Sequence, residues 1–274
     1  MASKREELIA KKLRALRGST SSKAVQDAVG ITPSKLSRIE SSYVRPRPDD
    51  VRLLATFYGA DTATVDKLVE ESRTARERGW WSEFAGPDWN KALSDHLELE
   101  SIAVRIDTWL IDLVPGLMQT PDYYRALIEG RPDVTDEQME RRLELRRKRR
   151  ERVETGDLEL WVVLGEAAIR QEIGGRAVLA GQLRYLRDAP ANVTVQVLPF
   201  TAGAHPGLGT SFHVLRFSDW PSLIYQDTIM HGLYHDAEED VRAHETTMEH
   251  VRAAALSPRQ TRDVLAQRID ELED

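Results

Sequence analysis

Residues 23–59 carry the pattern that most constrains the fold, because two short helical segments are separated there by one tight turn. The first helix, over 23–29, ends at Gly30, and glycine tolerates the positive φ of a helix C-cap. Thr32 and Pro33 then predict a second helix over 33–40. Threonine is a good N-cap, and proline at the first helical position gives up an N–H that would have no partner anyway.

Three further helices are expected around this pair, over 3–17, 49–58 and 62–78. Apolar residues recur at helical spacing in each segment, so each helix should bury one side. Together the five segments predict an all-α unit. The residues expected to face inward are Leu8, Leu13, Leu16, Ala24, Val25, Ala28, Leu36, Ile39, Val51, Leu54, Ala55 and Tyr58.

Charge is distributed unevenly along the chain. Residues 1–47 hold eleven Lys/Arg and four Asp/Glu, a net charge of +7. The whole chain has a net charge of -7, so residues 48–274 carry -14. A basic N-terminal segment followed by an acidic remainder is the charge asymmetry expected when only one domain binds the phosphates of DNA.

The second short helix has an outward side suited to double-stranded DNA. An α-helix fits the major groove, where hydroxyls and long cations can contact base edges and arginine pairs with guanine. Thr32 and the free N–H groups of a helix start can hold a phosphate. The predicted base-reading residues are Pro33, Ser34, Lys35, Ser37 and Arg38. The predicted phosphate-binding residues are Ser22, Lys23, Thr32, Arg45 and Arg47.

Residues 8–59 resemble the phage-repressor-like (Xre-type) helix-turn-helix family, especially in SKLSRIES, the proline-containing loop and VRLLATFYG. The resemblance implies a structural ion pair between Glu40 and an arginine of the first helix, with Arg17 the best match and Arg14 the second. Ser41-Ser42 replaces the usual pair ending in glycine after the second helix. Gln26 stands where a small alanine normally packs, and the first inter-helix turn is short.

The second part of the chain predicts a sheet with helices. Helices are expected at 89–103, 121–129, 135–154, 175–188, 237–255 and 258–272, and strands at 104–114, 158–164, 193–198, 211–217 and 222–229. The strand–helix–strand order over 158–198 predicts a parallel crossover, and the later, closely spaced strands predict antiparallel neighbours. We therefore expect an α+β protein. A phage-repressor-like domain over 1–79 would precede an α/β domain with a mixed sheet over 80–274.

This second part is similar to the C-terminal domain of a large group of actinobacterial Xre regulators. The motifs that carry the similarity are LVPGLMQTPDYYRALIEG, RRLELRRKR, LWVVLGEAAIRQEIGG, QLRYL, VTVQVLPFTAGAHPG and SPRQTRDVL. The resemblance implies an antitoxin-like transcriptional regulator that binds a small BldB-like partner protein and has no catalytic activity. There are two alternative functions for the C-terminal domain. It could sense a small-molecule ligand, or it could be an enzyme that the helix-turn-helix domain targets to DNA.

Other constellations favour structural roles. His231 and His235 have the i,i+4 spacing of a metal pair, but the glycine between them argues against a helix, and neither a metal nor a cofactor is expected. Gly174-Gly175 is explained by a helix start. The glycine-rich loop 201–209 is expected to be structural rather than a ligand lid. The run 141–152 should form a salt-bridged helix rather than a second contact surface. Trp80, Trp81, Phe84 and Trp89 should pack the linker onto the second domain rather than dock a partner.

Composition limits the cellular setting. The chain has no cysteine, no apolar run long enough to span a bilayer and no apolar segment behind its N-terminus. We expect a cytoplasmic protein without membrane contact. A single small helix-turn-helix contacts one half-site, so we also expect a homodimer.

Overall fold

The computed structural model describes residues 3–75, 77, 79–86, 89–129, 134–228 and 232–274. It forms two compact units, Met1–Ser101 and Ile102–Asp274, and each is described by itself. Residues 80–101, expected at the start of the second domain, group with the first unit. Within that unit Glu98 accepts a hydrogen bond from the Ser3 hydroxyl, so the segment is tied to the start of the chain.

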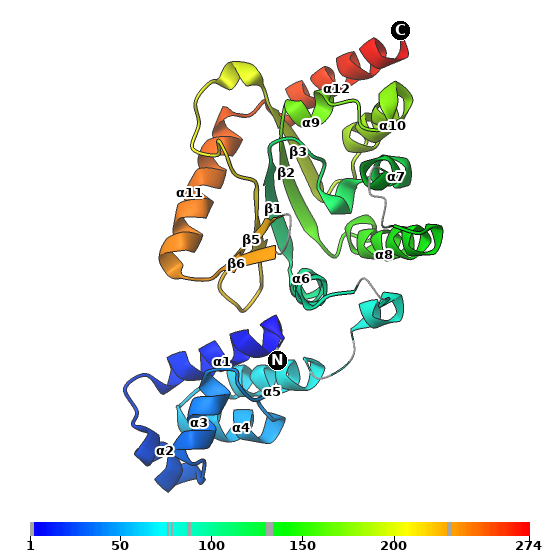
Figure 1. Ribbon diagram of the computed structural model, residues 1–274. Coiled ribbons are helices and arrows are strands. Elements are labelled where there is room, and N and C mark those ends of the chain that lie inside the picture. Colours follow the sequence, from blue (N-terminus) through cyan, green and yellow to red (C-terminus); the bar gives the residue numbers. More distant parts are fainter. Residues whose placement is uncertain (1–2, 76, 78, 87–88, 130–133, 229–231) are drawn as a thin grey trace. The chain divides into compact units, whose positions relative to one another are not determined.

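The first unit begins with the five helices that the sequence predicts, followed by a short 3₁₀ helix and a sixth α-helix (Figure 1). Helix α5 ends four residues earlier than expected, at Thr74 rather than residue 78. The bounds are α1 Lys4–Arg17, α2 Ser22–Val29, α3 Pro33–Glu40, α4 Pro48–Phe57, α5 Thr62–Thr74, η1 Trp80–Phe84 and α6 Lys91–Ile102.

The core of the five-helix part is built largely from the expected apolar positions, and it also includes Ile9, Ala10 and Ile31. Helix α2 is an exception, because only Val25 is buried there. Ala24 and Ala28, expected to face inward, are exposed. Helix α2 has only eight residues, and Val25 is the one side chain that it buries fully. The methyl groups of the two alanines lie beside the buried contact of Val25 rather than in it.

The second unit is a mixed six-stranded sheet with helices on both faces. Figure 1 shows α11 on one face, and α7, α8 and α10 on the other. The helices are α7 Pro121–Glu129, α8 Asp136–Glu154, α9 Ala167–Arg170, α10 Gly175–Arg187, α11 Glu238–Ala254 and α12 Pro258–Glu273, and the 3₁₀ helices are η2 Gly116–Met118 and η3 Phe200–Ala202. The strands are β1 Arg105–Leu110, β2 Glu159–Gly165, β3 Val193–Leu198, β4 Phe212–Arg216, β5 Leu223–Asp227 and β6 Gly232–His235.

The strand order is β3-β2-β1-β4-β5-β6. Strands β1, β2 and β3 are parallel, with Ile106 opposite Leu160 and Leu160 opposite Val193. Strands β4, β5 and β6 continue the sheet in antiparallel fashion. The mixed sheet, the parallel crossover and the antiparallel neighbours are all confirmed. The sequence interpretation missed strand β6 and the short helix α9.

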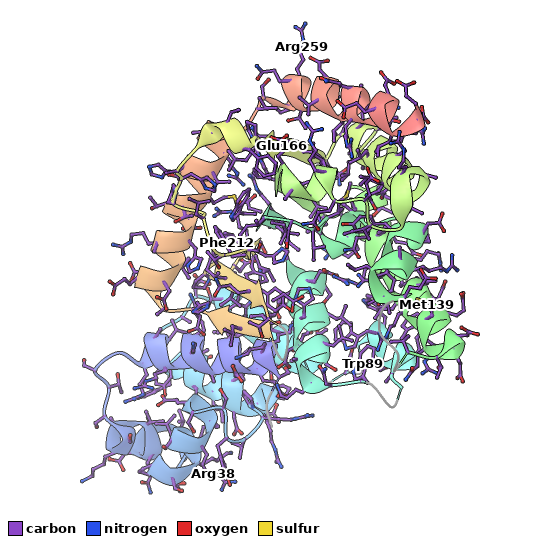
Figure 2. All side chains as sticks on the ribbon, turned by 45° about the horizontal axis from the view of Figure 1, so that its top comes forward. Arg38, Trp89, Met139, Glu166, Phe212 and Arg259 are labelled. Carbon is purple, nitrogen blue, oxygen red and sulfur yellow. The ribbon has the colours of Figure 1, made fainter. Side chains whose placement is uncertain are left out.

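The face of the sheet under α11 holds a hydrophobic core. Trp109 of β1 and Phe212 of β4 pack there against Met248 and Val251 of α11. Figure 2 labels Phe212 in this layer. Strand β1 is the central strand and is buried over Ile106–Trp109, so a polar residue in it must find its partners inside the unit.

Candidate DNA interface

Helix α3 is held in the orientation that its sequence predicts. Thr32 is the N-cap and its hydroxyl accepts a hydrogen bond from Lys35 N at 3.3 Å, and Pro33 is the first helical residue. Leu36 and Ile39 are each 1% exposed and anchor the helix from behind. The other side is open to solvent. Figure 2 shows Arg38 pointing away from the rest of the first unit.

The turn before α3 is made by a glycine in the left-handed region. Gly30 has φ +74° and ψ +8°, and its N–H donates to Gln26 O at 2.9 Å. A side chain would be strained at this φ, which explains why the two helices are joined by glycine. At the other end of α2 the cap is Ser21, whose hydroxyl accepts from Ala24 N. Ser22 is therefore the first helical residue and is half-buried.

The five predicted base-reading residues are all exposed on one stretch of surface, but they differ in what they contact. Lys35 Nζ lies 2.6 Å from Asp50 Oδ1, in the first turn of α4. The Arg38 guanidinium carbon lies 5.7 Å from the ring centroid of Tyr43. Pro33, Ser34 and Ser37 present their side chains to solvent. The helix thus offers hydroxyls and one arginine outward, while the lysine is shared with α4.

The predicted phosphate-binding residues lie around α3. Lys23 and Arg47 are exposed, and Arg47 is the N-cap residue of α4. Arg45 is also exposed, and its Nε lies 3.5 Å from the buried Glu6 Oε1. The hydroxyl of Thr32 already accepts the capping hydrogen bond. Its O–H is still free to donate to a phosphate, together with the unpaired N–H groups of the first turn of α3.

Arg17 and Glu40 form the ion pair that the family resemblance implies. Arg17 Nε donates to Glu40 Oε1 at 2.6 Å, and Arg17 Nη1 donates to Thr20 O. The pair joins the end of α1 to the end of α3. Burial and the nearby Glu40 carboxylate raise the pKa of Tyr58 to about 12, so this phenol stays protonated.

Asp50, Tyr43, Glu6 and Ser21 belong to this site and were not predicted. The cluster of hydroxyl residues over 19–22 predicts an N-cap for α2, but the sequence does not say which of these residues is the cap. Asp50 and Glu6 each stand in the first turn of a helix, where an acidic residue is expected for the helix dipole alone. No sequence signal distinguishes Tyr43 from an ordinary loop tyrosine.

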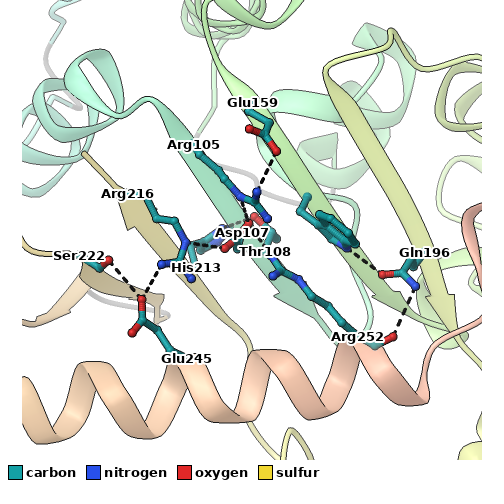
Figure 3. Close-up of polar contacts among 11 residues, drawn as sticks. Arg105, Asp107, Thr108, Glu159, Gln196, His213, Arg216, Ser222, Glu245 and Arg252 are labelled. Carbon is teal, nitrogen blue, oxygen red and sulfur yellow. Dashed lines mark hydrogen bonds and ion pairs between the residues drawn. The ribbon is translucent and has the colours of Figure 1, made fainter. Parts of the chain in front are cut away.

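The second unit contains a buried polar cluster around Asp107, which is fully buried on β1. Three arginines meet its carboxylate (Figure 3). Asp107 Oδ1 lies 2.7 Å from Arg105 Nε and 2.5 Å from Arg252 Nη2, and Oδ2 lies 2.8 Å from Arg216 Nε. Arg252 comes from α11 and the other two arginines come from β1 and β4. Asp107 therefore joins α11 to two strands of the sheet.

Neighbouring groups balance most of the charge in this cluster. Arg216 also pairs with Glu245 of α11, and Arg105 with Glu159 of β2. The guanidinium carbons of Arg105 and Arg252 lie 5.3 and 4.5 Å from the Trp161 ring centroid, and Trp161 Nε1 donates to Gln196 Oε1. Each carboxylate of the cluster is paired with at least one of its arginines. These ion pairs hold α11 against the sheet from within the second unit.

His235 and the Gly174-Gly175 pair, which the sequence singled out, are explained by their local structure. His235 is in strand β6, so helical spacing to a second histidine does not apply, and His231 lies outside the described residues. His235 stacks on His244, and Gly174 is the left-handed residue just before α10. Among the described residues, no group of three His, Cys, Asp or Glu side chains could hold a metal ion.

The glycine-rich loop is fixed by β1. Trp109 Nε1 donates to Gly207 O at 2.9 Å, and His205 packs edge-on against the Trp109 ring. A Cβ at position 207 would lie 2.7 Å from Val251 Cγ2 and 2.8 Å from Trp109 Nε1. The backbone of the loop therefore has to pass this close to the core, which only glycine allows.

The basic run and the aromatic linker were also expected to be structural. On α8, Arg147 pairs with Glu144 and Glu151, and Arg141 with Glu137, at helical spacing. In η1, Trp80 packs against Trp81 and Phe84. Trp89 Nε1 donates to Ser94 Oγ. The packing of these aromatic residues onto the second domain stays a prediction.

The first unit has the fold of a helix-turn-helix domain, and the exposed side of α3 supports DNA binding. In agreement, a family model described as a helix-turn-helix domain matches residues 8–68. A second model, described as a domain of unknown function (DUF5753), matches residues 93–267, and the chain belongs to this family. Searches of curated proteins and of solved structures found no match. In the described parts of the chain, no helix has the length and apolar character needed to cross a bilayer.

Proposed function

We propose that this protein is a sequence-specific transcriptional regulator of the Xre type, with α3 as its recognition helix. The observation that carries the proposal is the two-sided character of α3. Leu36 and Ile39 anchor one side, while Ser34, Ser37 and Arg38 are exposed on the other. A helix presented in this way fits the major groove, where arginine recognises guanine and serine serves either partner of a base pair.

Affinity would come mainly from phosphates. Lys23, Arg45 and Arg47 are exposed near α3, and the net charge of +7 over residues 1–47 favours approach to DNA. The acidic remainder of the chain would limit non-specific contact. One helix-turn-helix reaches a single half-site, so the proposal includes a homodimer that acts in the cytoplasm.

For the second unit we propose partner binding without a catalytic step. The support is its resemblance to the C-terminal domain of antitoxin-like actinobacterial regulators, which implies a small BldB-like partner protein. Sensing of a small ligand by the same unit is the competing proposal. Partner binding predicts that a second protein co-purifies with the chain. Ligand sensing predicts instead that a small molecule raises the melting temperature of the chain.

The DNA proposal is tested by selecting a duplex from a random library with the full chain and measuring its affinity by fluorescence anisotropy. Arg38→Ala should weaken binding to the selected duplex by roughly 1–3 kcal/mol. Arg73→Ala is the matched control, because Arg73 is an exposed arginine paired with Glu70 on α5. Failure to select any duplex, or equal effects of the two substitutions, would overturn the assignment of α3.

The partner proposal is tested by purifying the tagged chain from native extract and identifying what accompanies it. The candidate partner is then co-expressed with the chain, and the mass of the complex is measured by light scattering. A stoichiometric complex supports the proposal. If no partner forms such a complex and a small molecule raises the melting temperature instead, the second unit is a ligand sensor.

A further inference from the structure

Tyr43 is an aromatic side chain held in solvent directly after α3. It is 79% exposed, more than any other large hydrophobic side chain in the described part of the chain. A single exposed aromatic is unremarkable by itself. Two further features of Tyr43 suggest that its exposure is functional: the backbone conformation just before it and its position beside α3.

The turn that presents Tyr43 is strained and well fixed. Ser42 has φ +57°, and among the described residues it is the one non-glycine residue with a positive φ. Ser42 N donates to Ile39 O at 3.0 Å, and Val44 N donates to Arg38 O at 3.1 Å, so the segment is tied to the end of α3. Backbone strain that the surrounding structure maintains is often found at functional sites.

Exposure alternates along the segment that follows. Val44 is half-buried and Pro46 is buried, and the Ser72 hydroxyl of α5 donates to Pro46 O at 2.8 Å. Tyr43, Arg45 and Arg47 are exposed in between. The three exposed side chains therefore lie close together in sequence, in the short segment between α3 and α4.

We propose that Tyr43 contacts the sugar-phosphate backbone of duplex DNA beside the groove that α3 enters, an inference that rests on the proposed function. Its phenol O–H would donate to a phosphate oxygen while its ring packs on the adjacent deoxyribose. The Arg38 guanidinium, 5.7 Å from the ring, would be confined between Tyr43 and the bases. The ring therefore limits the freedom that Arg38 must lose on binding.

The experiment compares Tyr43→Phe and Tyr43→Ala in the full chain, on the duplex that the wild type selects from a random library. Loss of one hydrogen bond to a charged phosphate oxygen should weaken binding roughly 10- to 150-fold in Tyr43→Phe. Tyr43→Ala also loses the ring, so it should weaken binding further. The salt dependence of affinity should stay unchanged in both, because tyrosine carries no charge, whereas Arg45→Ala should flatten it.

Leu53→Ala is the matched control, because Leu53 is another exposed, large apolar residue of the same unit and should stay within twofold of wild type. Circular dichroism verifies that the variants fold. Wild-type affinity of Tyr43→Ala, alongside weakened Arg38→Ala, overturns this inference and leaves the proposed function standing. A changed oligomeric state with unchanged DNA affinity also overturns it, since Tyr43 would then lie in a subunit contact. If the wild type selects no duplex, both proposals fail together.

Discussion

Lys35 Nζ lies 2.6 Å from Asp50 Oδ1, so a cation on the outward side of α3 is held by a carboxylate of α4. The lysine side chain is 48% exposed and that of Asp50 is 11% exposed. The pair links two helices across the loop between them. It also means that Lys35 has to leave Asp50, or share it, before it can contact DNA.

Asp50→Asn should release Lys35 and strengthen binding to non-specific duplex. A freed lysine adds about one phosphate contact, so the logarithm of affinity should fall more steeply with the logarithm of salt, by about one unit. Asp49→Asn is the matched control, because it removes one exposed acidic charge from the same helix turn. Equal salt slopes in the two variants would show that the Lys35–Asp50 pair does not restrain Lys35.

Ser42→Gly should stabilise the first unit by up to roughly 1 kcal/mol, because glycine adopts a positive φ without strain. Ser41→Gly should do the opposite. Ser41 has φ −93°, so glycine there only adds freedom to the unfolded chain. Urea unfolding, followed by helical circular dichroism, measures both changes. A stabilising Ser41→Gly or a destabilising Ser42→Gly would contradict the argument from φ.

Asp107→Asn should destabilise the second unit by about 3–5 kcal/mol, because it removes the fully buried carboxylate that three half-buried arginines share. Glu159→Gln should cost less than about 1 kcal/mol, since Glu159 is 53% exposed and its pair with Arg105 is screened by water. Urea unfolding, followed by tryptophan fluorescence, compares the two. Similar losses in both would mean that Asp107 does not clamp α11 to the sheet.

Glu98 should make the first unit less stable as pH rises. Burial raises its pKa from 4.5 to about 7, against the opposing hydrogen bonds from Ser3 and Arg5. Between these values the folded state binds more protons than the unfolded state, so its stability falls as pH rises through that window. Glutamine mimics the protonated form. Glu98→Gln should therefore gain stability relative to wild type on going from pH 5 to pH 8.

Hydrogen exchange in α1 and α6 measures this difference within the first unit. Glu70→Gln is the control, because Glu70 is an exposed carboxylate of α5. Its stability difference from wild type should not change between the same two pH values. A pH-independent difference between Glu98→Gln and wild type would show that Glu98 stays ionised in the folded state.

The sequence alone determined most of the helices and the side that α3 buries. Helix starts and ends depend on residues within one turn, such as Thr32, Pro33 and Gly30, so local chemistry is enough to place them. The parallel crossover from β2 to β3 also followed from the order of the elements. Strand β6 was missed because four residues carry too short a pattern, and its pairing with β5 is what makes it a strand.

Only the tertiary structure decided which charges meet. Lys35 and Asp50 are 15 residues apart, and the arginines around Asp107 come from β1, β4 and α11. Ala24 and Ala28 match an inward pattern and are nevertheless exposed, and Val25 is the one side chain that α2 buries fully. Such contacts depend on how whole helices and strands pack. A side chain's neighbours in space are then set by the topology of the chain, and spacing along the sequence does not reveal them.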